Sequence, residues 1–195
     1  MEGGGDDAAL KSECRHGFTV LLERAGLKGR MPRVIACGGR RNAYEQYCKA
    51  RDNCNNGDNI YLLVDSEAPV VVKSPWDHVK NRAGDEWTKP AGSNDDQLHL
   101  MVQCMESWFL ADRKALKAFF GQGFQDSGLP AAAVEAIEGK ILCAVLESAT
   151  KNSKTKAVYH KGRHSFKLLA LIDPKLIRKA SPWAERFFST LENSL

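Results

Sequence analysis

The chain has 195 residues, of which 43% are hydrophobic and 27% charged, and its formal net charge is +4 at pH 7. This composition excludes an intrinsically disordered chain, and the length suits one domain or one domain with a helical extension. The longest apolar runs, Ile60–Val64 and Leu168–Ile172, are too short to cross a bilayer, and the acidic start of the chain is unlike a secretory signal. We therefore expect a soluble cytoplasmic protein that does not enter a membrane.

Apolar residues recur every three or four positions over residues 10–25, directly after Asp6 and Asp7. This spacing predicts an amphipathic helix with acidic residues at its positive end, and Gly26 ends it.

The next elements alternate between extended and helical. Val34–Cys37 predicts a buried strand, Gly38 and Gly39 a turn, and Arg40 to about Asn53 a second helix. Ile60–Val64 is the clearest strand. Strands separated by helices indicate βαβ units and a parallel sheet.

Residues 68–97 are rich in Pro, Gly and Asp and predict a loop with a short helical turn near Trp76–Asn81, followed by a strand over Leu98–Cys104. Helices are predicted over Trp108–Phe120 and Ala132–Ser148, and after Asp173-Pro174 and Ser181-Pro182. We expect an α/β fold in which residues 1–113 form a small parallel sheet flanked by helices, and residues 114–195 form a helical extension packed on it.

The six cysteines are scattered, and no two of them form a C-x-x-C pair. A structural zinc site and a disulfide framework are therefore not expected, and the cysteines are interpreted as small buried residues.

Basic residues are concentrated near the C-terminal end. Residues 151–195 carry ten Lys or Arg against three Asp or Glu, whereas residues 1–150 carry eighteen against twenty-one. A solvated basic loop is the ordinary interpretation of such a run. Because the rest of the chain is acidic, we favour an edge that binds a polyanion beside a carboxylate-rich pocket.

Two carboxylates follow the strand Ile60–Val64. Asp65 and Glu67 are two positions apart on an extended segment, so their side chains point the same way. Functional crevices in parallel sheets lie beyond the carboxyl ends of the strands, and Mg²⁺ prefers carboxylate oxygens. The alternative is an ordinary strand end with turn-forming residues.

Two further acids stand at helix starts. Glu2 lies beside Gly3–Gly5, whose backbone N–H groups can approach a phosphate, and it can serve as a ligand or general base. Glu106 follows the strand Leu98–Cys104, where an acid ordinarily complements the helix dipole.

Several motifs occur in an order that resembles a bacterial family of unknown function grouped with Toprim-like proteins, domain of unknown function 4276. They are Glu2–Asp6, Cys37–Arg40, Leu62–Glu67, Met105–Arg113, Lys161–Phe166 and the late Ser181-Pro182. The resemblance therefore covers nearly the whole chain.

Toprim domains of topoisomerases, primases and overcoming-lysogenization-defect nucleases use such acids with Mg²⁺ or Mn²⁺ in phosphodiester chemistry. The resemblance implies that Glu2 is the first-strand acid, that Asp65 and Glu67 are the metal-binding pair, and that Glu106 is the additional Glu of nuclease-type members. It also implies a role in phage defence beside a P-loop ATPase.

The sequence departs from that pattern in two ways. The metal-binding pair is D-x-E rather than D-x-D, and only Met1 stands where a first strand should precede Glu2. One hypothesis is that the native start lies upstream of Met1.

Our leading expectation is a metal-dependent nuclease that cleaves DNA or RNA, with Glu2, Asp65, Glu67 and Glu106 holding one or two ions. The residues expected to contact the phosphate backbone are Arg40, Lys161, Arg163, His164 and Lys167, with His164 a candidate general acid. The alternative is a binding or regulatory subunit that docks on an ATPase without cutting. A homo-oligomer is also expected.

Overall fold

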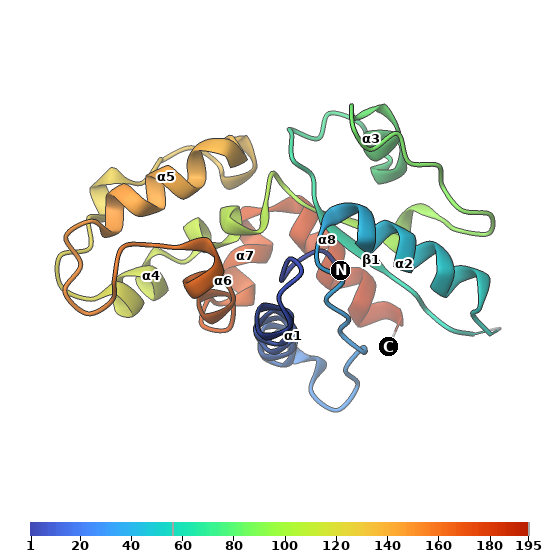
Figure 1. Ribbon diagram of the computed structural model, residues 1–195, viewed down its shortest axis with the longest axis horizontal. Coiled ribbons are helices and arrows are strands. Elements are labelled where there is room, and N and C mark those ends of the chain that lie inside the picture. Colours follow the sequence, from blue (N-terminus) through green and yellow to red (C-terminus); the bar gives the residue numbers. More distant parts are fainter. Residues whose placement is uncertain (56, 195) are drawn as a thin grey trace.

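The computed structural model describes residues 1–55 and 57–194 as a mostly helical molecule around a small parallel sheet (Figure 1). The strands are β1 (Leu62–Asp65) and β2 (Leu98–Met101). The α-helices of the described residues are α1 (Ala8–Leu22), α2 (Arg40–Asp52), α3 (Pro75–Asn81), α4 (Arg113–Phe120), α5 (Gly139–Thr150), α6 (Lys161–Leu169), α7 (Pro174–Ala180) and α8 (Pro182–Ser194). The expected fold class, a small parallel sheet flanked by helices with a helical C-terminal part, is confirmed.

The two strands pair in parallel, with Leu62 opposite Leu98 and Asp65 opposite Met101. All residues of both strands are buried, which explains why their sequences are apolar runs rather than alternating patterns. β2 ends at Met101, before the expected Cys104, because its partner there is the last residue of β1.

The strand expected at Val34–Cys37 does not form. The start of the chain lies between this segment and β1, and it makes only a few hydrogen bonds with the segment. The Met1 ammonium donates to Ile35 O (2.8 Å), and the Cys37 amide donates to Met1 O (2.9 Å). On the other side the Glu2 amide donates to Leu63 O (2.9 Å). Residues 1–3 therefore run alongside β1 in the manner of a short additional strand.

The helices largely follow the expected positions, with one clear difference. The helix expected over Ala132–Ser148 is interrupted at Ile137 and Glu138, whose ψ angles of 124° and 125° are extended. The interruption buries Ile137 in the core, and α5 begins only at Gly139. A further helix, α6, forms over Lys161–Leu169, within the basic stretch that was interpreted as a polyanion-binding edge.

Helix α6 packs closely against α1. Gly17 of α1 makes this possible, because a Cβ atom there would lie 2.6 Å from the backbone oxygen of Phe166. At the other end of the chain α8 packs against β2. The residues after 113 therefore contact the sheet and the first helix of the preceding part.

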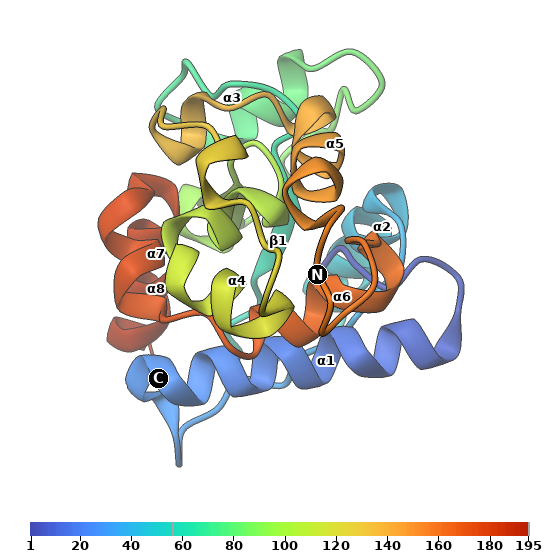
Figure 2. The same ribbon diagram turned by 90° about the vertical axis from the view of Figure 1, so that its left-hand side faces the viewer.

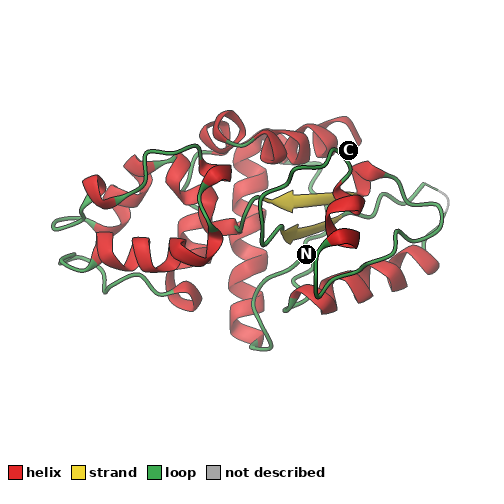
Figure 3. Cartoon of the chain, turned by 90° about the horizontal axis from the view of Figure 1, so that it is seen from above, coloured by secondary structure: helices red, strands yellow, loops and turns green. Residues whose placement is uncertain are grey.

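The views from the side and from above show the arrangement of these layers. Helix α1 runs along one side of the molecule (Figure 2) and, seen from above, crosses between the two strands and the lobe that contains α4, α5 and α6 (Figure 3). The carboxyl end of β1 faces that lobe.

In residues 1–55 and 57–194, no helix has the length together with the hydrophobicity needed to span a lipid bilayer.

Candidate metal centre

Three carboxylates from distant parts of the chain meet at the carboxyl end of β1. Glu2, Asp65 and Glu67 each offer an oxygen, and these atoms lie within 4.8 Å of one another. Asp65 is the last residue of β1, Glu67 follows two positions later, and Glu2 lies on the segment beside β1. We call these three residues the acidic centre.

Glu2 is held by two contacts to one oxygen of its carboxylate. The Asp65 amide donates to Glu2 Oε2 over 3.1 Å, and Arg40 Nη1 lies 3.6 Å from the same oxygen. Burial raises the pKa of Glu2 above its usual value, although the positive charge of Arg40 opposes that effect.

Asp65 is buried and only partly neutralised by its neighbours. Its Oδ1 accepts a hydrogen bond of 2.8 Å from the Met105 amide, at the start of the 3-10 helix η3 (Met105–Ala111). Burial, followed by the charges of Glu2 and Glu106, raises the pKa of this carboxyl well above its usual value. A divalent cation beside Asp65 would relieve this repulsion.

Glu67 is the exposed member and is held in an unusual backbone conformation. Its φ angle is +61°, in the left-handed region that side chains other than glycine seldom adopt. The Glu67 amide donates to Gln103 O (2.8 Å), and a ring nitrogen of His78 lies 2.9 Å from Ser66 O. Such strain commonly marks functional positions, where surrounding contacts maintain it.

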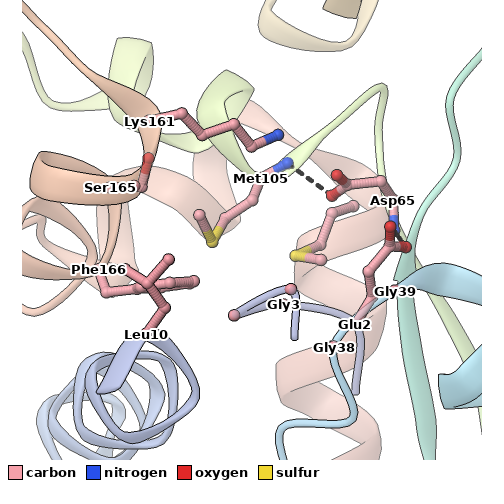
Figure 4. Close-up of a pocket in the computed structure, with 14 residues that line it drawn as sticks. Glu2, Gly3, Leu10, Gly38, Gly39, Asp65, Met105, Lys161, Ser165 and Phe166 are labelled. Carbon is pink, nitrogen blue, oxygen red and sulfur yellow. Dashed lines mark hydrogen bonds between the residues drawn. The ribbon is translucent and has the colours of Figure 1, made fainter. Parts of the chain in front are cut away.

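A cavity of about 280 Å³ opens beside Glu2 and Asp65 (Figure 4). One wall is glycine-rich, because Gly3, Gly4 and Gly5 approach the Gly38-Gly39 turn. The residues lining the cavity are Glu2, Gly3, Gly4, Gly5, Leu10, Gly38, Gly39, Asp65, Met101, Met105, Lys161, Gly162, Ser165 and Phe166. The Lys161 side chain extends across it toward Asp65 (Figure 4).

Glu106, the fourth expected acid, is not part of the acidic centre. It is fully buried on η3, and its Oε1 lies 3.4 Å from Lys161 Nζ. The hydroxyls of Tyr159 and Ser165 donate to the same oxygen over 3.4 Å and 3.3 Å. Its other oxygen, Oε2, is buried and has no hydrogen-bond partner among the described residues. Lys161 therefore stands between Glu106 and the cavity.

Of the five residues expected to bind phosphate, Lys161 and Arg40 lie at the centre. Arg40 pairs with the buried carboxylate of Asp85 (2.6 Å from Nη2) and covers the ring of Trp87 at 4.7 Å. These contacts, together with the one to Glu2, make Arg40 a support for the acidic centre.

The other three residues of the expected phosphate-binding set lie away from the cavity. His164 is buried against Phe119 and Phe120, and its Nδ1 accepts a hydrogen bond of 3.1 Å from the His160 amide. Lys167 pairs with Glu13 on α1 (3.6 Å), and Arg163 is exposed. The buried setting of His164 matches a structural histidine rather than a general acid.

Sequence reasoning missed several residues that build the site. Asp85 lies in a segment interpreted as loop, and Tyr159 lies in the basic stretch of residues 151–195. Nothing local in the sequence marks either residue. Asp85 pairs with Arg40, which is 45 positions away, and Tyr159 donates to Glu106, which is 53 positions away.

Comparison with known proteins gives one match. The family profile described as Domain of unknown function (DUF4276) matches residues 1–192. No significant match was found among curated proteins or among solved structures.

Proposed function

Since the chain belongs to the DUF4276 family, whose description assigns no activity, we propose a function from its acidic centre: a metal-dependent nuclease of the Toprim type that cleaves phosphodiester bonds in DNA or RNA. The single observation that carries this proposal is the meeting of Glu2, Asp65 and Glu67 at the end of β1.

The donor set fits Mg²⁺ or Mn²⁺. All three side chains offer hard carboxylate oxygens, and they are close enough together to share one ion. Sulfur and imidazole ligands, which favour zinc, are not part of this group.

A divalent ion in such a site polarises the scissile phosphate and lowers the pKa of water. The protein residues have separate tasks. Glu2, Asp65 and Glu67 hold the ion, and Arg40 keeps the Glu2 carboxylate oriented. The ammonium of Lys161 faces the cavity, where it would attract a phosphate oxygen. The glycine-rich wall lets a sugar-phosphate chain approach the backbone closely.

The order of the acids supports a Toprim relationship. One Glu lies on the segment beside β1, and the Asp-x-Glu pair lies at the end of β1 itself. By this relationship we propose that the protein is the effector of an anti-phage defence system, paired with a P-loop ATPase, and that it forms homo-oligomers.

One observation favours a second candidate function. Glu106, the expected additional acid of nuclease-type members, is fully buried, pairs with Lys161 and is not part of the acidic centre. A Toprim-like subunit that binds or regulates an ATPase without cutting nucleic acid would tolerate this loss.

The two candidates are distinguished by incubating purified protein with labelled RNA, single-stranded DNA and plasmid, with and without Mn²⁺. A nuclease cleaves at least one substrate only when Mn²⁺ is present. Asp65→Asn keeps an oxygen for the Met105 amide but removes the charge, so cleavage should fall by at least about 100-fold. The exposed Asp77→Asn is the matched control and should cleave normally. Cleavage that persists in Asp65→Asn would overturn the assignment, and absence of cleavage on every substrate favours the regulatory subunit.

A further inference from the structure

Lys161 lines the cavity and places its ammonium beside the buried carboxylate of Glu106. Its Nζ is 3.4 Å from Glu106 Oε1, and the side chain crosses the cavity toward Asp65 (Figure 4). The ammonium therefore has the Glu106 carboxylate within ion-pair distance and points toward the carboxylate of Asp65, as a cation shared by the two acids would.

Glu106 itself indicates that this position calls for a cation. The carboxylate is completely buried, and its Oε2 has no hydrogen-bond partner among the described residues. A buried carboxylate in this state requires a positive neighbour, because removing a charge from water is costly. In the described structure that neighbour is Lys161.

From these contacts we propose that the centre binds one divalent ion, on Glu2, Asp65 and Glu67, and that the Lys161 ammonium permanently takes the place of a second ion between Asp65 and Glu106. This inference rests on the proposed metal-dependent function and specifies how many ions the site holds.

The local charges agree with a single ion. When ionised, the acidic centre and Glu106 carry four negative charges. Lys161 contributes one positive charge, and the ion-paired group of Arg40, Arg82 and Asp85 contributes another. The remaining two negative charges equal those that one Mg²⁺ or Mn²⁺ neutralises. A second divalent ion would leave an excess of positive charge before any substrate binds.

The wild-type chain gives the first test. Titration with Mn²⁺, followed by calorimetry and electron paramagnetic resonance, should yield one ion per chain and the spectrum of an isolated Mn²⁺. Two ions at the roughly 3.5–4 Å separation of a two-metal site would give a spin-coupled spectrum instead. That spectrum, or a stoichiometry of two, would overturn the inference. Absence of Mn²⁺ binding would overturn the proposed metal-dependent function as well.

A variant of Lys161 gives the second test. Lys161→Met keeps an unbranched side chain one atom shorter than that of lysine and removes the charge, so the number of bound Mn²⁺ ions should rise from one to two. Lys167→Met, on the outer face of the same helix, should still bind one. Adding Glu106→Gln to Lys161→Met should restore a stoichiometry of one, because the second ion loses its ligand. A folded Lys161→Met protein that binds only one ion contradicts the inference, and the wild-type spectrum decides the matter if this variant does not fold.

Discussion

The backbone amide of Asp65 donates a hydrogen bond to the Glu2 carboxylate over 3.1 Å, joining residues that are 63 positions apart. The same Glu2 residue is bonded to β1 through its own amide and Leu63 O. Both the backbone and the side chain of Glu2 are thus oriented by the strand that carries Asp65. These contacts hold the Glu2 carboxylate beside Asp65 in the acidic centre.

We expect Glu2→Gln to weaken Mn²⁺ binding by more than about tenfold, because one charged ligand becomes a neutral amide. The amide oxygen can still accept the Asp65 hydrogen bond, so the free energy of unfolding should change little. Calorimetric titration with Mn²⁺ measures the affinity. Glu13→Gln on α1 is the control, and an unchanged affinity in Glu2→Gln would remove this residue from the ligand set.

The glycine-rich wall of the cavity depends on Gly38. Its φ angle is +85°, and a Cβ atom there would lie 2.4 Å from the backbone oxygen of Gly5. We therefore expect Gly38→Ala to lower the free energy of unfolding by about 2–3 kcal/mol, measured by urea denaturation. Gly39→Ala is the matched control, since that position has an ordinary φ of −70° and no atom within 4 Å. Gly39→Ala should lower the free energy of unfolding by less than about 1 kcal/mol. Equal decreases in the two variants would contradict this explanation.

Local patterns in the sequence predicted only part of this architecture. Asp65 and Glu67 were expected together because residues two apart on an extended segment share a side. They do lie together, but that reason was wrong, since β1 ends at Asp65 and Glu67 has a left-handed backbone with a φ of +61°. The pairing of Lys161 with Glu106 could not be predicted in the same way, because it arises only when α6 packs beside η3. The basic residues of α6 also obscured its helical period, although Phe166 and Leu169 mark its buried face.

The break in the predicted helix over residues 132–148 has a similar origin. Ile137 fits the apolar stripe of a helix, and nothing in the local pattern distinguishes it from its neighbours. Packing decides its conformation, since an extended backbone at Ile137 and Glu138 buries the Ile137 side chain. Tertiary contacts thus override a local helical preference.

The left-handed backbone of Glu67 predicts a conflict between stability and metal binding. Such a conformation costs a residue with a side chain roughly 1–2 kcal/mol, whereas glycine adopts it freely but loses roughly 0.5–1 kcal/mol of entropy on folding. Glu67→Gly should therefore leave the free energy of unfolding unchanged or raise it by up to about 1 kcal/mol, while Mn²⁺ affinity falls. Glu86, with a φ of +46° and outside the acidic centre, is a matched control. Glu86→Gly should change the free energy of unfolding as Glu67→Gly does, but without lowering the Mn²⁺ affinity. A strongly destabilised Glu67→Gly would contradict the argument.

His99 on β2 should make the stability of the fold depend on pH. Burial, reinforced by the charge of Arg186, lowers the pKa of His99 to about 3, while a hydrogen bond involving the Asp96 backbone acts against this shift. An unfolded histidine has a pKa of about 6.5, so between these values only the unfolded chain takes up the proton. The free energy of unfolding should thus fall as the pH drops from about 6.5 toward 3, by up to about 1.4 kcal/mol per pH unit from this residue. Urea denaturation from pH 7 to pH 4.5 measures the slope, which should decrease in His99→Leu and stay unchanged in His16→Asn, at an exposed position. An equal slope in His99→Leu and the wild type would mean that other groups cause the acid sensitivity.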